Sequence, residues 1–266
     1  CTKLLYEYLG DLIVLDVGGA TTDLHSVTVE SDQVARLMIS PEPKAKRTVE
    51  GDLGVYVNRW KVVESIGEEK LREQCREQGF SMEHALETYR AIPKTEEEVK
   101  LVELLTREAV VKAAERHAGR LRYIYGPSGR STVAEGKDLT QVKYIVGTGG
   151  ALTRLPHREE IMREITRCNE SGMLLLPGEH AQILVDHDYI MASLGVLSKR
   201  YPQAAARLLE QSLGMTFPER KAEEPVPVCN KELSRLETQR QQREEELQRH
   251  IEECEAMGYD MSAYRE

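Results

Sequence analysis

The stretch Asp11-Leu12-Ile13-Val14-Leu15-Asp16-Val17-Gly18-Gly19-Ala20-Thr21-Thr22-Asp23 decides the fold that we expect for this chain. Its apolar run at 12–15 predicts a strand buried on both faces. Gly18 and Gly19 allow a tight turn, in which consecutive backbone N–H groups form an anion-binding concavity. Asp16 and Asp23 offer the hard carboxylate oxygens that Mg²⁺ prefers. The stretch therefore predicts a turn that holds phosphate groups and their magnesium ion.

The residues that complete this turn narrow the choice of motif. Thr21 and Thr22 add hydroxyl donors, and the β-branched residues at 24–29 predict a second strand. A Walker P-loop is excluded, because it ends in Gly-Lys-Ser/Thr and continues as a helix. The alternative is an ordinary β-hairpin with a glycine turn and surface acids.

A second glycine cluster occupies residues 144–156, with the sequence YIVGTGGALTRLP. It predicts a strand, a glycine turn and a helix over 157–168. The dinucleotide-binding fingerprint fails here, because Leu152 stands where glycine or alanine is required. What remains is a turn whose backbone can lie against a flat ring, with an arginine placed to stack on the ring or reach a phosphate. The candidate binding residues are Gly147, Gly149, Gly150, Ala151 and Arg154, and the alternative is a simple strand-to-helix turn.

Together the two clusters resemble the motifs of the actin-like ATPase superfamily, which includes actin, sugar kinases and DnaK-type chaperones. The first cluster matches Asp-x-Gly-Gly-x-Thr-x-Asp at Asp16, Gly18, Gly19, Thr21 and Asp23. The second resembles Gly-Gly-x-Thr-Arg-x-Pro, with one extra residue after the glycines. The resemblance implies an α/β fold, a ribonuclease H-like lobe that binds ATP/ADP with Mg²⁺. Asp16 would position the ion or the attacking water.

The resemblance narrows to the MutL/GlmL family at residues 16–26, 46–54, 136–140 and 147–154, and it extends over about residues 10–200. It implies a chaperone-like reactivating factor, which uses ATP to help an adenosylcobalamin-dependent mutase exchange damaged cofactor. The implied protein partner is that mutase, for example glutamate mutase.

One motif of the superfamily is missing from the chain. Its first phosphate motif, of Asp-x-Gly-x-Ser/Thr type, does not precede Asp16, and the chain begins with Cys1. We therefore expect the C-terminal half of a longer protein, whose other partner is the missing N-terminal lobe. Because hydrolysis in this superfamily depends on both lobes closing on the nucleotide, we expect this half to turn ATP over feebly or not at all.

The expected organisation has three parts. The core comprises residues 1–48 and 141–200, the inserted subdomain 49–140, and a linker with an extended helix 201–266. The sequence predicts strands at 12–15, 24–29, 34–39, 144–146 and 182–186, helices at 52–63, 82–91, 96–117, 157–168 and 189–199, a hairpin at 120–133, a linker at 219–227 and a helix at 230–257.

Bulk properties exclude several classes of function. The net charge of −9 argues against nucleic acid, and no apolar run is long enough to span a membrane. Five cysteines without a Cys-x-x-Cys pair suggest free thiols in the cytoplasm. We expect solvated acids at Asp186-His187-Asp188 rather than a metal site, and a charged His117 at the end of a helix. Lys112 and Arg116 on that helix either flank the nucleotide ring or are surface charges.

Three functional classes stay open from the sequence. The first is the ATP-driven reactivating factor, and the second is a small-molecule kinase of the same superfamily. The third is a nucleotide-free scaffold that keeps the fold, although a scaffold has no use for carboxylates at a phosphate turn.

Overall fold

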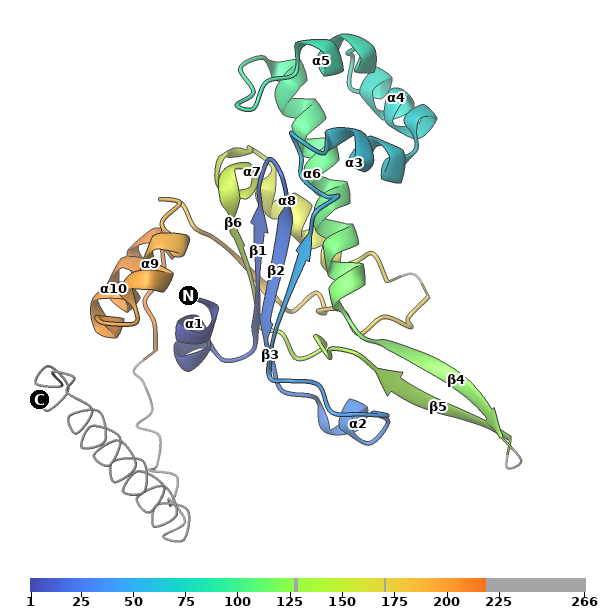
Figure 1. The fold of residues 1–266 in the computed structure, drawn as a ribbon, viewed down its shortest axis with the longest axis vertical. Coiled ribbons are helices and arrows are strands. Elements are labelled where there is room, and N and C mark those ends of the chain that lie inside the picture. The colour runs from blue at the N-terminus through green and yellow to red at the C-terminus, as the bar shows by residue number, and fades with distance from the viewer. Residues whose placement is uncertain (127–128, 170, 219–266) are drawn as a thin grey trace, which may run out of the picture. The chain divides into compact units, whose positions relative to one another are not determined.

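The computed structural model describes residues 1–126, 129–169 and 171–218 (Figure 1). The chain divides into two compact units, Cys1–Glu219 and Arg220–Glu266. The second unit lies outside the described residues, and so do the linker expected at 219–227 and the helix expected at 230–257.

A five-stranded mixed sheet forms the centre of the first unit, in the order β3-β2-β1-β6-β7. Its strands are β1 (Leu12–Val17), β2 (Thr22–Val27), β3 (Ala45–Glu50), β6 (Tyr144–Thr148) and β7 (Gln182–Val185). β2 pairs antiparallel with both β1 and β3, whereas β6 and β7 run parallel to β1. Asp16 of β1 pairs with Thr148 of β6, so the two strands end side by side and both glycine turns leave the same edge. The α/β class is thereby confirmed.

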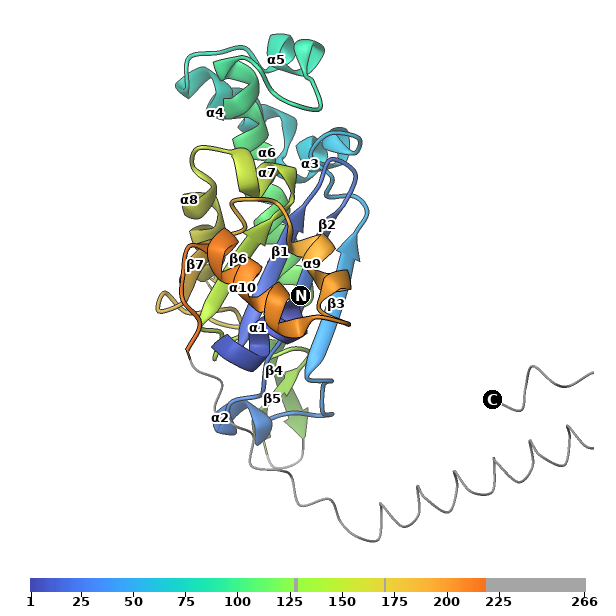
Figure 2. The ribbon, with the colours of Figure 1, turned by 90° about the vertical axis from the view of Figure 1, so that its left-hand side faces the viewer.

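Helices cover both faces of this sheet (Figures 1 and 2). One face packs on α1 (Thr2–Leu9), α9 (Met191–Leu197) and α10 (Pro202–Leu213), and the other on α6 (Glu96–His117), α7 (Gly149–Arg154) and α8 (Arg158–Arg163). Leu12 and Val14 belong to the hydrophobic cluster that includes α1, α9 and α10, whereas Ile13 and Leu15 belong to the cluster that includes α6, α7 and α8. This alternation explains why the strand consists of consecutive apolar residues.

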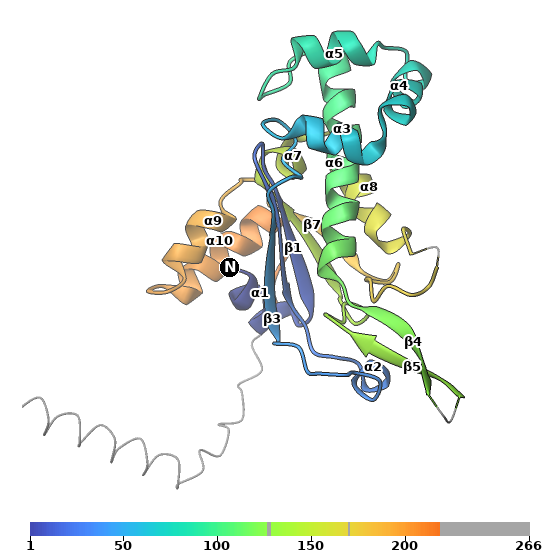
Figure 3. The same cartoon turned by 45° about the vertical axis from the view of Figure 1, so that its right-hand side comes forward.

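A group of helices joins β3 to α6 and lies beyond the end of the sheet, around the first part of α6 (Figure 3). It consists of α3 (Arg59–Ile66), α4 (Glu68–Glu77) and α5 (Met82–Thr88), which pack on α6 or on one another. The predicted helix at 96–117 is confirmed at both ends. It begins there because Thr95 and Glu98 form a reciprocal capping box. Arg90 also holds the buried carboxylate of Glu98, at 2.8 Å.

The predicted hairpin is also confirmed, as β4 (Arg120–Gly126) and β5 (Gly129–Glu135). The strand predicted at 34–39 is wrong. Ser31 instead caps a short helix, α2 (Asp32–Ala35), and the third strand of the sheet begins only at Ala45.

Three further boundaries differ from the sequence prediction. The helix expected at 52–63 begins only at Arg59, because residues 55–57 donate backbone hydrogen bonds to the first glycine turn. The helix expected at 157–168 is shorter and ends in a 3₁₀ turn, Glu164–Thr166. The start of the region expected as a linker, from residue 201, forms α10, which contacts α9.

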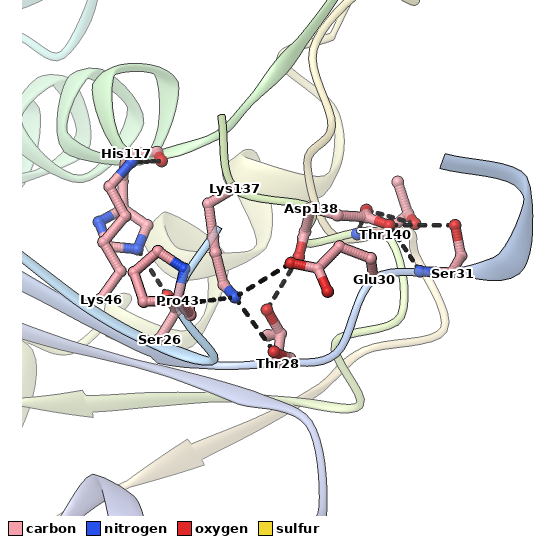
Figure 4. A network of polar contacts seen from close by, with 10 residues as sticks. All are labelled: Ser26, Thr28, Glu30, Ser31, Pro43, Lys46, His117, Lys137, Asp138 and Thr140. Carbon is pink, nitrogen blue, oxygen red and sulfur yellow. Dashed lines mark hydrogen bonds and ion pairs between the residues drawn. The ribbon is translucent and has the colours of Figure 1, made fainter. Parts of the chain in front are cut away.

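Buried polar groups fasten α6 to the sheet at its C-terminal end (Figure 4). The ring of His117 is fully buried, with Ser26 Oγ 2.8 Å from Nε2 and Thr48 Oγ1 2.8 Å from Nδ1. Burial lowers the pKa of His117 to about 3, and the charge of Lys46 adds to the effect. The expected charged imidazolium is therefore wrong, because this histidine is neutral.

The neighbouring part of this network is built on Lys137 and Asp138, both fully buried (Figure 4). Lys137 Nζ donates to the carbonyl oxygens of Thr28 at 3.1 Å and Pro43 at 2.9 Å. Asp138 accepts from the hydroxyl of Ser31 and from the backbone of Thr140. The Gly-Lys-Asp-Leu-Thr segment at 136–140 therefore ties the chain leaving the hairpin to the loop between β2 and β3.

Candidate functional site

The first glycine turn is held by the segment that follows β3. Gly18 N–H donates to Thr21 O at 2.9 Å, which closes the turn. The carbonyl oxygens of Gly18 and Gly19 accept hydrogen bonds from the backbone of residues 55–57. Within the described residues, the N–H groups of Gly19 and Ala20 donate to no protein acceptor. Both residues are exposed, so these N–H groups could serve an anion.

Asp16 lies at the end of β1, half-buried beside this turn. Burial raises its pKa, and the nearby carboxylates of Asp23 and Asp186 raise it further. Among the described residues its carboxylate has no hydrogen-bond partner. A carboxylate in this condition gains from a cation or from a water molecule bound to one.

Asp23 faces Asp16 across the β1–β2 pair, but its carboxylate already has partners. Arg47 approaches one oxygen at 2.7 Å, and the hydroxyl of Thr21 donates to the other at 3.1 Å. In the described part of the chain, no group of three or more His, Cys, Asp or Glu side chains could hold a metal ion. A bound Mg²⁺ would therefore take most of its ligands from water and phosphate, as this ion commonly does.

The second glycine turn contains one packed and one open glycine. Gly149 has φ +85°, and a Cβ built on it would lie 2.5 Å from Asp16 Oδ1 and 2.6 Å from Val17 O. Only glycine therefore lets the two strand ends approach this closely. A Cβ on Gly150 would meet no atom within 4 Å. Gly150 thus leaves open space on the side where a ligand would lie.

A cavity of about 650 Å³ joins the two turns. Its volume lies within the range typical of small-molecule sites. The walls combine three groups of residues: the first turn with Val17, Gly18 and Gly19; the second with Gly150, Ala151, Arg154, Leu155 and Pro156; and an apolar wall with Val55, Tyr56, Tyr89, Ala91, Ile92, Pro93, Val99 and Val102. Tyr189 completes the lining.

The structure brings Gly18, Gly19, Gly150, Ala151 and Arg154 together in this cavity. The other predicted binding residues are not part of its lining. Gly147 is packed against Met162 within β6, and Thr22 is buried with its hydroxyl donating to Leu53 O at 2.7 Å. Asp16, Thr21, Asp23 and Gly149 adjoin the turns that line the cavity.

Two charges on α6 are engaged elsewhere. Arg116 forms ion pairs with Glu50 and Asp52, and Lys112 pairs with Glu115. Neither residue lines the cavity. Of the two alternatives for Lys112 and Arg116, the structure therefore favours surface charges.

Asp186 is the residue at which the sequence prediction fails most clearly. It was expected to be solvated, but it is fully buried. Its carboxylate accepts from Thr148 Oγ1 at 2.8 Å and from Ser212 Oγ at 2.6 Å, and also from two backbone N–H groups at the start of α9. Asp186 lies four residues before Ile190, the N-cap residue of α9, so no local capping pattern in the sequence marks its role.

Comparison with known proteins identifies the family. A family model described as "MutL protein" matches residues 1–213. The chain belongs to the MutL protein family. Protein MutL from Clostridium tetanomorphum is 36% identical over 211 residues, which are 77% of this chain and 46% of that relative. The chain thus spans about half the length of the curated MutL protein that it matches.

Two further observations concern the described residues as a whole. None of the helices described is both long and apolar enough to cross a membrane. The three cysteines in the described ranges, Cys1, Cys75 and Cys168, are all free thiols. Burial raises the pKa of Cys75 and of Cys168 to about 11, so neither is activated as a nucleophile.

Proposed function

We propose that this chain binds ATP or ADP with Mg²⁺ in the cavity between the two glycine turns. It would be the nucleotide-binding half of an ATP-dependent reactivating factor for a cobalamin-dependent mutase. The observation that carries the proposal is the convergence of two glycine turns, separated by more than a hundred residues of sequence, on one cavity. An ordinary hairpin turn gives no reason for that convergence.

The chemistry of the cavity suits the two ends of a nucleotide. Free N–H groups at Gly19 and Ala20, with Asp16 beside them, suit a phosphate chain and its magnesium ion. The open backbone at Gly150, the apolar wall and the arginine at 154 suit a flat heterocycle. Asp23 would act through water or after Arg47 moves away, because Arg47 occupies its carboxylate.

The fold and the family support the assignment to an actin-like ATPase and to a reactivating factor. Three antiparallel strands followed by two parallel ones are the arrangement expected of a ribonuclease H-like lobe in an actin-like ATPase. Membership of the MutL family supports the role in reactivation, with the mutase as protein partner. Turnover of ATP would belong to the longer protein.

Calorimetry tests the binding proposal. The chain is titrated with ATP in the presence of Mg²⁺ and again in the presence of a chelator. We expect Asp16→Asn to weaken binding about tenfold or more with Mg²⁺ and to matter much less without it. Asp32→Asn, a change of an exposed acid on α2, is the matched control. Absence of any binding by the wild-type chain would refute the proposal.

A second experiment tests the partner. The full-length protein is mixed with a mutase that carries inactivated cobalamin, and phosphate release is measured. Stimulated release without phosphorylation of a small molecule supports the reactivating factor. Phosphorylation of a small molecule would indicate a kinase instead.

A further inference from the structure

Tyr189, in the turn between β7 and α9, has an unusual backbone conformation. Its φ is +55°, and no other non-glycine residue in the described ranges has a positive φ. This left-handed conformation is unfavourable for a bulky side chain, and such strain persists where the surroundings enforce it. Tyr189 is also about half exposed, at 52%. The turn therefore holds a large ring out of the core.

The buried Asp186 enforces this turn. Its carbonyl oxygen accepts from Tyr189 N–H at 3.2 Å, and its carboxylate accepts from Ile190 N–H at 3.2 Å and Met191 N–H at 3.0 Å. Ser212 on α10 donates to the same carboxylate and also binds the backbone N–H of Asp188 at 3.1 Å. Both ends of the turn are thus tied to a fully buried group, and Tyr189 lies between them.

Tyr189 contributes to the wall of the cavity, together with the second glycine turn. The backbone at Gly150 faces open space, and Arg154 lines the same cavity. An exposed aromatic ring beside an open backbone surface and a guanidinium suits a planar or sugar group, because rings and guanidinium planes stack on such groups. The first turn, with its free N–H groups, supplies the contrasting surface for phosphate.

We propose that Tyr189 contacts the nucleoside part of the ligand, and that its strained backbone conformation serves to present its ring to the cavity. This inference rests on the proposed nucleotide binding and adds to it a specificity-determining residue. Substitution at Tyr189 then affects recognition of the nucleoside and leaves recognition of the phosphate chain unchanged.

The test compares ATP with tripolyphosphate, both with Mg²⁺, on the wild-type chain and on Tyr189→Gly and Tyr189→Phe. Glycine adopts the left-handed conformation without strain, so Tyr189→Gly keeps or raises resistance to urea. We expect it to bind ATP about tenfold more weakly, since a lost aromatic stacking contact has an effect of this order. Tripolyphosphate affinity should stay within about twofold. Tyr189→Phe keeps the ring and should behave as the wild type.

The outcomes separate this inference from the proposed function. If the wild type binds ATP and Tyr189→Gly binds it equally well, the role of Tyr189 is refuted and nucleotide binding stands. Equal weakening of ATP and tripolyphosphate also refutes it, because the residue then acts on the whole site. If the wild type binds neither probe, both proposals fail. Tyr201→Ala, a change of another exposed tyrosine that does not line the cavity, controls for loss of a surface ring.

Discussion

Replacement of Gly149 by alanine should separate the structural role of the second glycine turn from its binding role. The new Cβ would lie 2.5 Å from Asp16 Oδ1, 2.6 Å from Val17 O and 2.7 Å from Val17 N. Two of these three atoms belong to the backbone of the central strand, which cannot move aside as the end of a side chain can. The substitution therefore forces apart the ends of β1 and β6.

Two terms set the size of the effect. Alanine at φ +85° costs about 1–2 kcal/mol for the left-handed conformation. Overpacking of a close-packed interior costs about 1–3 kcal/mol more. We expect Gly149→Ala to lower the free energy of unfolding by about 2–5 kcal/mol, a large part of the stability of a typical domain.

Gly150→Ala is the matched control, because it makes the same chemical change one residue later. Its Cβ meets no atom within 4 Å, and alanine favours a helix over glycine by up to about 1 kcal/mol. We expect stability to be unchanged or slightly higher, whereas affinity for ATP falls because the methyl group enters the cavity. Urea unfolding followed by circular dichroism measures stability, and calorimetry measures binding. Equal stability of Gly149→Ala and the wild type, at equal urea dependence, would refute the packing argument.

Three further predictions concern stability. Thr95→Ala removes the side-chain cap of α6 and should cost about 1 kcal/mol in urea unfolding; a cost near zero would show that the cap is dispensable. His117 has its pKa lowered to about 3, so between pH 6.5 and 3 the unfolded chain binds more protons than the folded one. His117 should contribute a fall in stability of up to about 1.4 kcal/mol per pH unit below pH 6.5, and His117→Gln should reduce the slope by that contribution; an unchanged slope would contradict the neutral ring. Lys137→Met leaves the carbonyl oxygens of Thr28 and Pro43 without their buried donor, for which we expect a loss of about 1–3 kcal/mol in the same assay; unchanged stability would mean that water replaces the ammonium group.

The features that sequence predicts well are those whose cause is local. Thr95 and Glu98 form a capping box within four residues, so the start of α6 is visible in the sequence. The prediction of a strand at 34–39 was wrong, although the cap that starts a helix there is also a local feature. Ser31 caps a helix there, and Val34, Leu37 and Met38 pack around the base of the hairpin instead of pairing in the sheet.

In the candidate site too, some features have a local cause and others depend on residues distant in sequence. The glycines at 18, 19, 149 and 150 are recognisable as two adjacent pairs after apolar runs, and at Gly149 the backbone itself requires glycine, at φ +85°. The buried state of Asp186 depends on Ser212 and Thr148, which are 26 and 38 residues away in sequence. The apolar wall of the cavity likewise depends on how the helices after β3 pack on α6. Such distant packing leaves no periodic signal at any one residue.

The long helix α6 connects the cavity wall to the central sheet. Val99 and Val102, near one end, form part of the cavity wall, whereas His117 at the other end is hydrogen-bonded between β2 and β3. At 1.5 Å per residue these ends lie about 27 Å apart along one continuous rod. The end at His117 is held to the sheet by the two hydrogen bonds of this buried ring. A tilt of α6 about that end would therefore displace the cavity wall further than it displaces His117.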